Sequence, residues 1–367
     1  MSWRAYGLAV SLAVVMGVIS VSAAALLDLP LRDPDGFLGP SWVRLPMIVL
    51  ICFAADVVPR SLFRARGVRG LYRQARNVIH ERWTPGRITV IVVGLGCFYI
   101  TYVTYRNLKS FLPFVREVIH DDQLAALDRW LAFGHEPATL LHDLLGTGIS
   151  AQVLSTIYVG YLIFVPVSVA FWLVWSRNLA GGLWYATALC FNWCLGLASY
   201  YLIPSQGPAF VEPSLFWDLP DTGVSQLQAG LWYARSVVIT DPHQTESVFG
   251  IAGFASLHVS VLFSAALLAH LAVRTTWIRV AHWAFLGATI VSTLYFGWHY
   301  IADDVAGLAI GWFAVWAGAV ATGHSLRGNY RGLVFGPGPQ IEAAIRPLPE
   351  PGPSSPTVAR TRVTSSG

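Results

Sequence analysis

The 367-residue chain is too apolar to be a pair of ordinary soluble domains. Hydrophobic residues make up 55% of it and charged residues only 12%, about half the charged share of a typical soluble domain. The formal net charge of +4 comes from arginines that gather in loops beside apolar runs. This pattern is typical of membrane topology and speaks against nucleic acid as a partner.

Eight apolar runs follow one another along the chain, and each is predicted to form a helix that crosses the membrane. Such a crossing needs about 20 mostly apolar residues. In chain order the runs are 6–27, 45–58, 88–105, 154–175, 179–204, 257–273, 280–298 and 300–322. The first run is longer than a usual signal-peptide core, so we interpret it as a retained anchor. The second is the shortest, and its Pro46 leaves open a re-entrant segment.

The distribution of arginine predicts the orientation of these crossings. The loop from Arg60 to Arg87 carries eight arginines against a single acid, Glu81, which places it in the cytoplasm. Eight crossings then put both termini on the cytoplasmic side, together with the short basic turns after the fourth and sixth runs. The two large loops, 106–153 and 205–256, are therefore expected outside.

The expected fold is an all-α polytopic bundle of about eight spans in the plasma membrane, with a core of six helices. Residues 1–87 should form a transmembrane hairpin with its basic cytoplasmic loop, and residues 88–324 the membrane-embedded core. Residues 325–367 are predicted to be a disordered cytoplasmic tail. The end of this segment is rich in Pro, Gly, Ser and Thr and has no apolar periodicity.

Four polar residues at membrane depth stand out, because polar groups are costly there and usually functional. Ser256 and His258 stand where an outer loop enters the sixth run. His299 and Asp303 stand at the outer turn between the seventh and eighth runs, and one helical hairpin brings the two histidines to the same face. His299 and Asp303 are four residues apart, so the carboxylate can hold the imidazole. Ser256 begins a helix, and a helix N-terminus suits an anionic phosphate.

These residues resemble the signature of the type 2 phosphatidic acid phosphatase superfamily. The matching pattern is Ser256-x-His258, then His299-Tyr300-x-x-Asp303 and Gly307. Within the superfamily, the chain is most similar to the branch of inositol phosphorylceramide synthases and their bacterial relatives. Two earlier segments add to the similarity: Asp122 to Asp128 with Phe133-Gly134, and Tyr201 to Pro208. The resemblance covers roughly residues 90–322.

The resemblance implies a lipid phosphate phosphatase or phosphotransferase that works through a phosphohistidine at the extracytoplasmic face. His299 would attack phosphorus, and Asp303 would orient it. His258 would protonate the leaving oxygen and then activate the acceptor, while Ser256 would hold a phosphate oxygen. The substrate would be a lipid phosphate or phospholipid, and the acceptor would be water or a polyol. Neither a metal nor a cofactor is required.

The sequence departs from the superfamily pattern where a cation is usual. A Ser-Arg pair commonly precedes the nucleophilic histidine, but here Ser292 is followed by Thr293. The Lys/Arg-Pro motif is missing too, and Ala209 stands where relatives often carry a basic residue. Something must still balance the charge of a phosphate. Arg106 and Lys109, the only lysine, lie at the outer exit of a span, so we predict that this pair binds phosphate.

Other interpretations remain open at this point. The histidines and Asp303 could form a structural polar cluster, and the chain could be a catalytically inactive transporter or scaffold. A vanadate-dependent haloperoxidase shares the His/Asp arrangement but fits poorly with so many spans. Asp304 is expected to be a neighbour rather than a catalyst, and Asp122 and Asp128, on an amphipathic segment, to be structural. The cysteines all lie in apolar runs and no histidine spacing matches a metal site, so neither a disulfide framework nor a bound metal is expected.

Overall fold

The described part of the chain consists of helices and loops without a strand, which confirms the predicted all-α class. The computed structural model describes residues 4–36, 41–65, 67–177, 179–328 and 330. The helices are α1 (Arg4–Leu27), α2 (Ser41–Arg64), α3 (Val68–Arg82), α4 (Pro85–Val115), α5 (Asp121–Leu131), α6 (Pro137–Leu145), α7 (Ile149–Ala170), α8 (Leu179–Leu202), α9 (Pro208–Val211), α10 (Gly223–Thr240), α11 (Leu257–Ala272), α12 (Thr276–Tyr295) and α13 (Ile301–Ala321). A π-helical turn, η2 (Phe171–Trp175), extends α7, and a 3-10 turn, η3 (Pro213–Phe216), follows α9.

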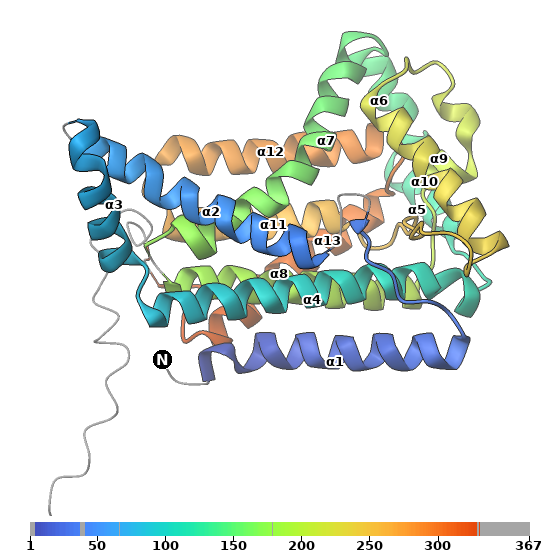
Figure 1. The fold of residues 1–367 in the computed structure, drawn as a ribbon. Helices are drawn as coiled ribbons and strands as arrows, with labels where there is room; N and C mark the ends of the chain where they lie inside the picture. Colours follow the sequence, from blue (N-terminus) through green and yellow to red (C-terminus); the bar gives the residue numbers. More distant parts are fainter. Residues whose placement is uncertain (1–3, 37–40, 66, 178, 329, 331–367) are drawn as a thin grey trace, which may run out of the picture.

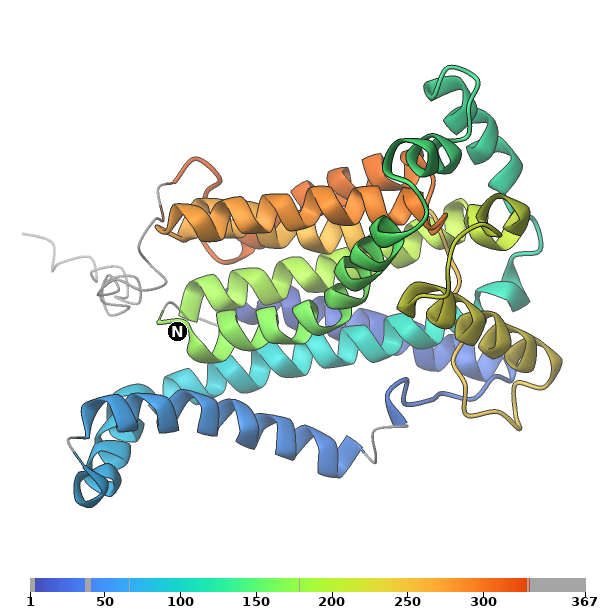
Figure 2. The same ribbon diagram turned by 90° about the horizontal axis from the view of Figure 1, so that it is seen from above.

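Five of these helices are each long and apolar enough to cross a membrane. They are Tyr6–Leu27 in α1, Val43–Arg64 in α2, Pro85–Val115 in α4, Ile149–Trp175 in α7 with η2, and Ile301–Ala321 in α13. The other three predicted crossings are helices as well, α8, α11 and α12, and they run along the same bundle (Figures 1 and 2). α11 has only 16 residues, and most of α8 is buried against protein. A helix that faces protein needs less apolar surface than one that faces lipid.

The second predicted crossing is a continuous helix rather than a re-entrant segment. α2 is unbroken across Pro46. Its carboxylate Asp56 is fully buried and accepts hydrogen bonds from Arg82 Nε at 2.9 Å and Trp83 Nε1 at 3.1 Å. Arg60, one turn further along α2, also pairs with Asp56. Such partners are what a buried carboxylate requires, and they fix this part of α2 to the end of α3.

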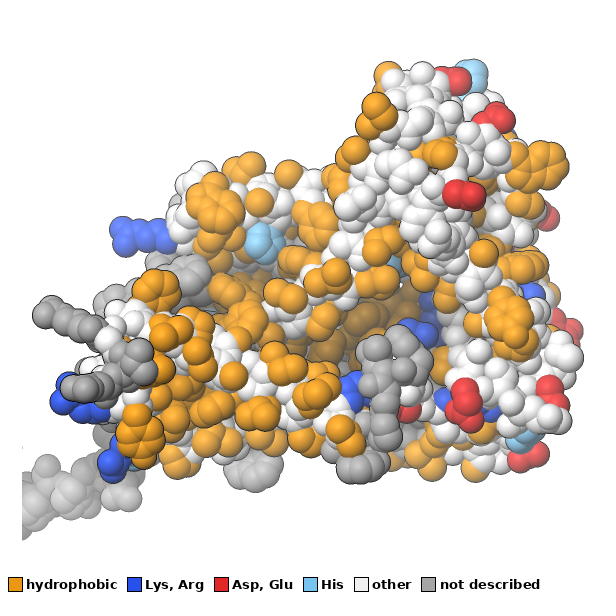
Figure 3. Space-filling view, turned by 45° about the horizontal axis from the view of Figure 1, so that its top comes forward, with side chains coloured by type: hydrophobic (Ala, Val, Ile, Leu, Met, Phe, Trp, Pro, Cys, Tyr) orange, Lys and Arg blue, Asp and Glu red, His pale blue; other side chains and the backbone are white. Residues whose placement is uncertain are grey.

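The two ends of the bundle differ. α3, which comes from the arginine-rich loop, lies across one end, and α5, α6, α9 and α10 gather at the other (Figure 1). Figure 3 shows apolar side chains over the side of the bundle, with acidic side chains concentrated at the end that carries α5 and α6. An apolar side between two polar ends is the surface of a protein that spans a membrane.

The predicted C-terminal tail falls mostly outside the described residues. α13 ends at Ala321, and the loop after it folds back so that the His324 ring stacks on Trp184 at 4.7 Å. Residues 331–367 are not among those described, so the disorder predicted for 325–367 stays a prediction there.

α11 and α13 pack closely through glycine. A Cβ at Gly307 would lie 2.5 Å from the carbonyl oxygen of Ser256, and one at Gly311 would lie 2.5 Å from that of Ser260. Two helix backbones approach this closely only where no side chain stands between them, and glycine leaves that space free. The contact sets the position of α11, which begins next to His258, against α13.

Replacing Gly311 with alanine is expected to push α13 away from α11 and lower the thermal stability, because overpacking a close contact costs about 1–3 kcal/mol. Gly287 on α12 offers a matched control, since a Cβ there would meet no atom within 4 Å. Thermal unfolding of the detergent-solubilised variants measures the difference. Equal unfolding midpoints for Gly311→Ala and Gly287→Ala would contradict the close packing.

Candidate active site

His299 lies in the short turn between α12 and α13, held from both sides. Gly297 has a left-handed backbone (φ 64°), and the Trp298 amide donates to the Thr293 carbonyl at 2.8 Å. Asp303, in the first turn of α13, accepts from the Tyr300 amide at 3.0 Å through Oδ2. The same oxygen lies 3.3 Å from His299 Nδ1. The carboxylate therefore fixes both the start of the helix and the orientation of the imidazole.

His258 meets His299 across the start of α11. Nδ1 of His258 is 3.5 Å from Nε2 of His299, and the ring centroids are 5.7 Å apart. The structure thus brings together the two histidines and Asp303, as their positions along the chain suggested. Their chemical roles stay predictions.

Aromatic rings surround the histidine pair. Tyr158 and Tyr161, both on α7, lie 4.7 and 4.5 Å from the His258 ring. Trp298 stacks on Tyr158 at 5.1 Å. His299 is only 5% exposed. His258 is half-buried. The rings keep most water away from His299 and so strengthen the electrostatic interactions between polar groups there.

Ser256 caps α11 and is fully buried. Its hydroxyl accepts from the Val259 amide at 3.4 Å and lies near the Asp304 carboxyl. Thr293, at the position where superfamily members usually carry arginine, also donates to Asp304, at 3.0 Å. Asp304 is thus buried and accepts from the Thr293 hydroxyl, while the Ser256 hydroxyl accepts from the backbone at the start of α11.

Lys109 is the cation beside the histidines. It is buried on α4, with its Nζ 4.7 Å from the centroid of Tyr200, and its charge acts on both imidazoles. Arg106, one turn before it, is half-buried, acts electrostatically on Lys109 and donates to the Tyr102 hydroxyl at 3.4 Å. Both predicted phosphate-binding cations therefore lie on the helix face near the site.

His299 is neutral in this environment. Burial and, next to it, the charge of the Lys109 ammonium lower the pKa of His299 well below its usual range. The Gly253 backbone, next to the imidazole, opposes this shift. A neutral imidazole with one nitrogen bound to an acceptor keeps a lone pair on the other nitrogen, which is what a nucleophile requires.

α5 carries two buried carboxylates at the edge of the site, and one of them is not the residue that the sequence suggested. Asp122 is exposed, whereas Asp121 is only 1% exposed and accepts from the amides of Gln206 and Gly207 at 3.0 and 2.9 Å. Asp128, 2% exposed, accepts from the amide of Ile301 at 3.0 Å. Burial raises the pKa of Asp128 to about 6. The sequence signal for Asp121 is its spacing of seven residues from Asp128, two turns along one face of a helix.

The loop from Ser205 to Ala209 forms another wall of the site. Gly207 has a left-handed backbone (φ 96°), and a Cβ there would lie 2.5 Å from the Trp298 carbonyl oxygen. The Ala209 amide donates to the Gly297 carbonyl at 2.9 Å. The Ser205 hydroxyl accepts from the Phe254 amide at 2.9 Å, just ahead of α11. This loop therefore touches both segments that carry histidine.

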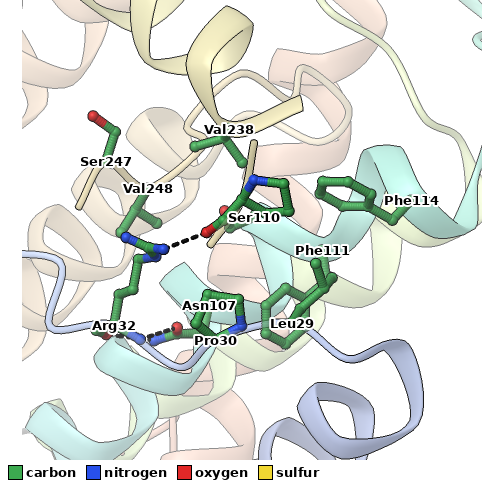
Figure 4. A pocket seen from close by; sticks show the side chains of 11 residues that line it. Leu29, Pro30, Arg32, Asn107, Ser110, Phe111, Phe114, Val238, Ser247 and Val248 are labelled. Carbon is green, nitrogen blue, oxygen red and sulfur yellow. Dashed lines mark hydrogen bonds between the residues drawn. The ribbon is translucent and has the colours of Figure 1, made fainter. Parts of the chain in front are cut away.

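A small cavity of about 10 Å³ lies on the other side of α4 from these residues. Arg32 donates its backbone amide to Asn107 Oδ1 at 2.8 Å, and its guanidinium to the Pro242 carbonyl (Figure 4). A space of this size holds about one water molecule. The cavity therefore belongs to the joint between the α1–α2 loop and α4.

Among the described residues, no group of three or more His, Cys, Asp or Glu side chains could hold a metal ion.

Comparison with known families identifies the fold around this site. A sequence model described as the PAP2 superfamily matches residues 122–317, more than half of the chain. The matched stretch includes His258, His299 and Asp303 but leaves Arg106 and Lys109 outside. No curated protein and no solved structure gives a significant match. With its apolar helices and this match, the chain is a membrane protein that belongs to the PAP2 superfamily.

Proposed function

We propose that the protein transfers a phosphoryl group from a lipid phosphate to water or to a polyol, through a phosphohistidine on His299. The superfamily indicates a phosphatase-type enzyme. The phosphohistidine is supported by the arrangement of Asp303, His299 and His258 in a row. The Asp303 carboxylate lies 3.3 Å from Nδ1 of His299, and Nδ1 of His258 lies 3.5 Å from Nε2 of His299. An orienting acid, a nucleophile and an acid–base group stand in that order.

The first step uses the free nitrogen of His299. Asp303 holds Nδ1, so Nε2 forms the bond to phosphorus as the bond from phosphorus to the leaving oxygen breaks. His258, protonated when the phosphate is bound, gives its proton to that oxygen. In the second step neutral His258 takes a proton from the acceptor, whose oxygen attacks phosphorus and releases His299. At 3.5 Å the two nitrogens leave no room for phosphorus, so substrate binding must separate the rings.

Lys109 and Arg106 supply positive charge for this chemistry. A buried phosphate and its developing charge need compensation, which preorganised donors provide most strongly where water is excluded. Lys109 is placed among aromatic rings with its charge directed at both histidines, and Arg106 stands one turn away. These cations take the place of the arginine and Lys/Arg-Pro motif that the sequence lacks.

A lipid substrate fits the surroundings of the site. The turn between α12 and α13, to which His299 belongs, lies at the end of the bundle opposite α3, which corresponds to the extracytoplasmic side if the arginine-rich loop stays in the cytoplasm (Figure 1). Figure 3 shows a hollow on the side of the bundle, with apolar walls and basic side chains at its edge. Apolar walls suit acyl chains, and basic groups suit a phosphate headgroup. The proposed location is the plasma membrane.

The test is turnover by purified protein in detergent, with lipid phosphates and phospholipids as donors, and with or without inositol or another polyol. Phosphate release without a polyol identifies a phosphatase, and polyol-dependent headgroup transfer identifies a transferase. With radiolabelled donor, an acid-labile label on His299 would mark the intermediate. A protein that turns over none of the donors and takes no label would support the inactive transporter or scaffold.

Replacing Lys109 with alanine is expected to lower kcat/KM roughly 10²-fold, because one donor to the transferred group is lost. Arg106→Ala should have a smaller effect in the same direction, since Arg106 stands further along α4. Arg116, exposed just beyond α4, gives the matched control Arg116→Ala. Steady-state kinetics with one lipid phosphate measure all three. Retained or increased turnover in Lys109→Ala would remove this pair from the mechanism.

A further inference from the structure

We propose that α5 is a clamp whose buried carboxylates, Asp121 and Asp128, are positioning residues for the nucleophile His299. The inference rests on the proposed function, because the position of an imidazole matters most where it reacts. Among the described residues, neither carboxylate forms a hydrogen bond with either histidine. Both therefore act through the segments to which they bind.

Asp121 joins two loops that are far apart in the sequence. Its Oδ1 accepts from the amides of Gln206 and Gly207 at 3.0 and 2.9 Å, and from the Tyr300 hydroxyl at 3.1 Å. Its Oδ2 also lies 3.0 Å from the Gln206 amide. One carboxylate therefore ties the loop before α9 to the residue that follows His299. No Lys or Arg forms an ion pair with Asp121 among the described residues, so these donors alone satisfy it.

Asp128 holds the next residue of the same segment. Both of its oxygens lie 3.0 Å from the amide of Ile301, the first residue of α13. Three successive residues are therefore each tied to a different carboxylate: His299 to Asp303, Tyr300 to Asp121 through its hydroxyl, and Ile301 to Asp128. Asp303 binds this segment from within α13, and α5 binds it from outside.

The loop held by Asp121 extends the clamp to His258. Ser205, next to Gln206, receives hydrogen bonds from the amides of Gly253 and Phe254 at 2.8 and 2.9 Å. These residues lead directly into the start of α11. α5 is thus connected through hydrogen bonds to both segments that carry a histidine. Catalytic geometry must be held to a fraction of an ångström, and rigid partners of this kind provide that precision.

The decisive experiment compares Asp121→Ala with Asp122→Ala. Both remove a carboxylate from the first turn of α5, but only Asp121 is buried and bonded to the loops. Asp121→Ala should lower kcat roughly 10²-fold with little change in KM, because a misplaced reacting group costs about that much. Asp121→Asn should recover part of the loss, since its oxygen can still accept from Gly207 and Tyr300. Asp122→Ala should behave as the wild type.

A milder variant guards against simple misfolding. Tyr300→Phe removes only the hydroxyl that donates to Asp121, and it should lower kcat roughly 10-fold without a matching loss of thermal stability. Gly311→Ala serves as a destabilised reference. If Asp121→Ala and Tyr300→Phe lose no more kcat than variants of equal thermal stability, Asp121 holds only the fold and the clamp is wrong.

A readout independent of turnover separates this inference from the proposed function. Diethyl pyrocarbonate modifies accessible neutral imidazoles, and peptide mass spectrometry reports the rate at His299. The clamp predicts faster modification in Asp121→Ala than in Asp122→Ala. If the wild type turned over no lipid phosphate, the proposed function would fail, while this comparison would still decide the clamp. Equal rates at His299 in the two variants would overturn it.

Discussion

A variant with alanine at His299 is expected to lose lipid phosphate turnover by on the order of 10³-fold or more, the scale on which removing a covalent nucleophile acts in other enzymes. The reason is geometric. Asp303 occupies Nδ1 of His299 and leaves Nε2 as the nitrogen that can attack. No other imidazole in the described chain has a carboxylate at hydrogen-bonding distance and a second histidine on the opposite side. His258 cannot substitute for it, because Asp303 does not orient its ring.

The measurement must separate lost chemistry from lost folding. His282, on α12, bonds only the Ile278 carbonyl of its own helix, so His282→Ala is a matched histidine control. In both variants, the midpoint temperature of thermal unfolding should differ from that of the wild type by no more than an ordinary substitution causes. Labelling with radioactive donor should mark the wild type and His282→Ala but not His299→Ala. If His299→Ala still turned over the lipid phosphate, the phosphohistidine mechanism would be wrong, whatever the thermal stability of the variant.

The meeting of the two histidines could be predicted because short-range rules determine it. One helical hairpin separates His258 from His299 along the chain, and such a hairpin returns to the face it left. The i, i+4 spacing of His299 and Asp303 predicted their contact in the same way. Neither prediction needed knowledge of how distant helices pack.

The role of Asp121 could not be predicted, because its partners lie 85, 86 and 179 residues away. The seven-residue spacing puts Asp121 rather than Asp122 on the helix face of Asp128, but only the packing of α5 decides that this face is buried. The same limit applies to Ser256. Its place at a helix N-terminus was predictable, but its position next to Asp304 depends on how closely α11 and α13 approach at Gly307.

Membrane spans show a related limit. The helices that are long and apolar enough to cross a membrane lie in α1, α2, α4, α7 with η2, and α13, and half or more of each apolar stretch is not buried by protein. α8 lies at the centre of the bundle, packed against α4, α11 and α13, and most of its residues are buried by protein. A central helix can contain a polar residue such as Asn192, because the Ser264 hydroxyl on α11 accepts its hydrogen bond. It can also contain a small residue such as Gly196, which lets Leu257 of α11 approach its backbone. Its apolar run, 179–204, predicted a span in the same way as the others, but the sequence did not show that this helix is the central one.

Replacing His258 with phenylalanine is expected to slow turnover of a lipid phosphate ~10²- to 10⁴-fold, the usual contribution of a general acid. Phenylalanine keeps a ring against Tyr158 and Tyr161, which lie 4.7 and 4.5 Å from the His258 ring, and so limits the loss of packing. The alkoxide that leaves a lipid phosphate is strongly basic and needs a proton as its bond to phosphorus breaks. Among the described residues, His258 is the side chain that lies 3.5 Å from His299 Nε2, so its loss removes the proposed proton donor.

The dependence on the leaving group distinguishes this role from a structural one. p-Nitrophenyl phosphate releases a weakly basic phenolate that needs no proton, so His258→Phe should form the phosphohistidine from it almost as fast as the wild type. The second step still needs His258 as a base, so the variant should release one burst of nitrophenolate and then stall with the label on His299. Rapid-quench kinetics with both substrates measure the two steps. Equal losses in the first step for both leaving groups would show that His258 supports the shape of the site and transfers no proton.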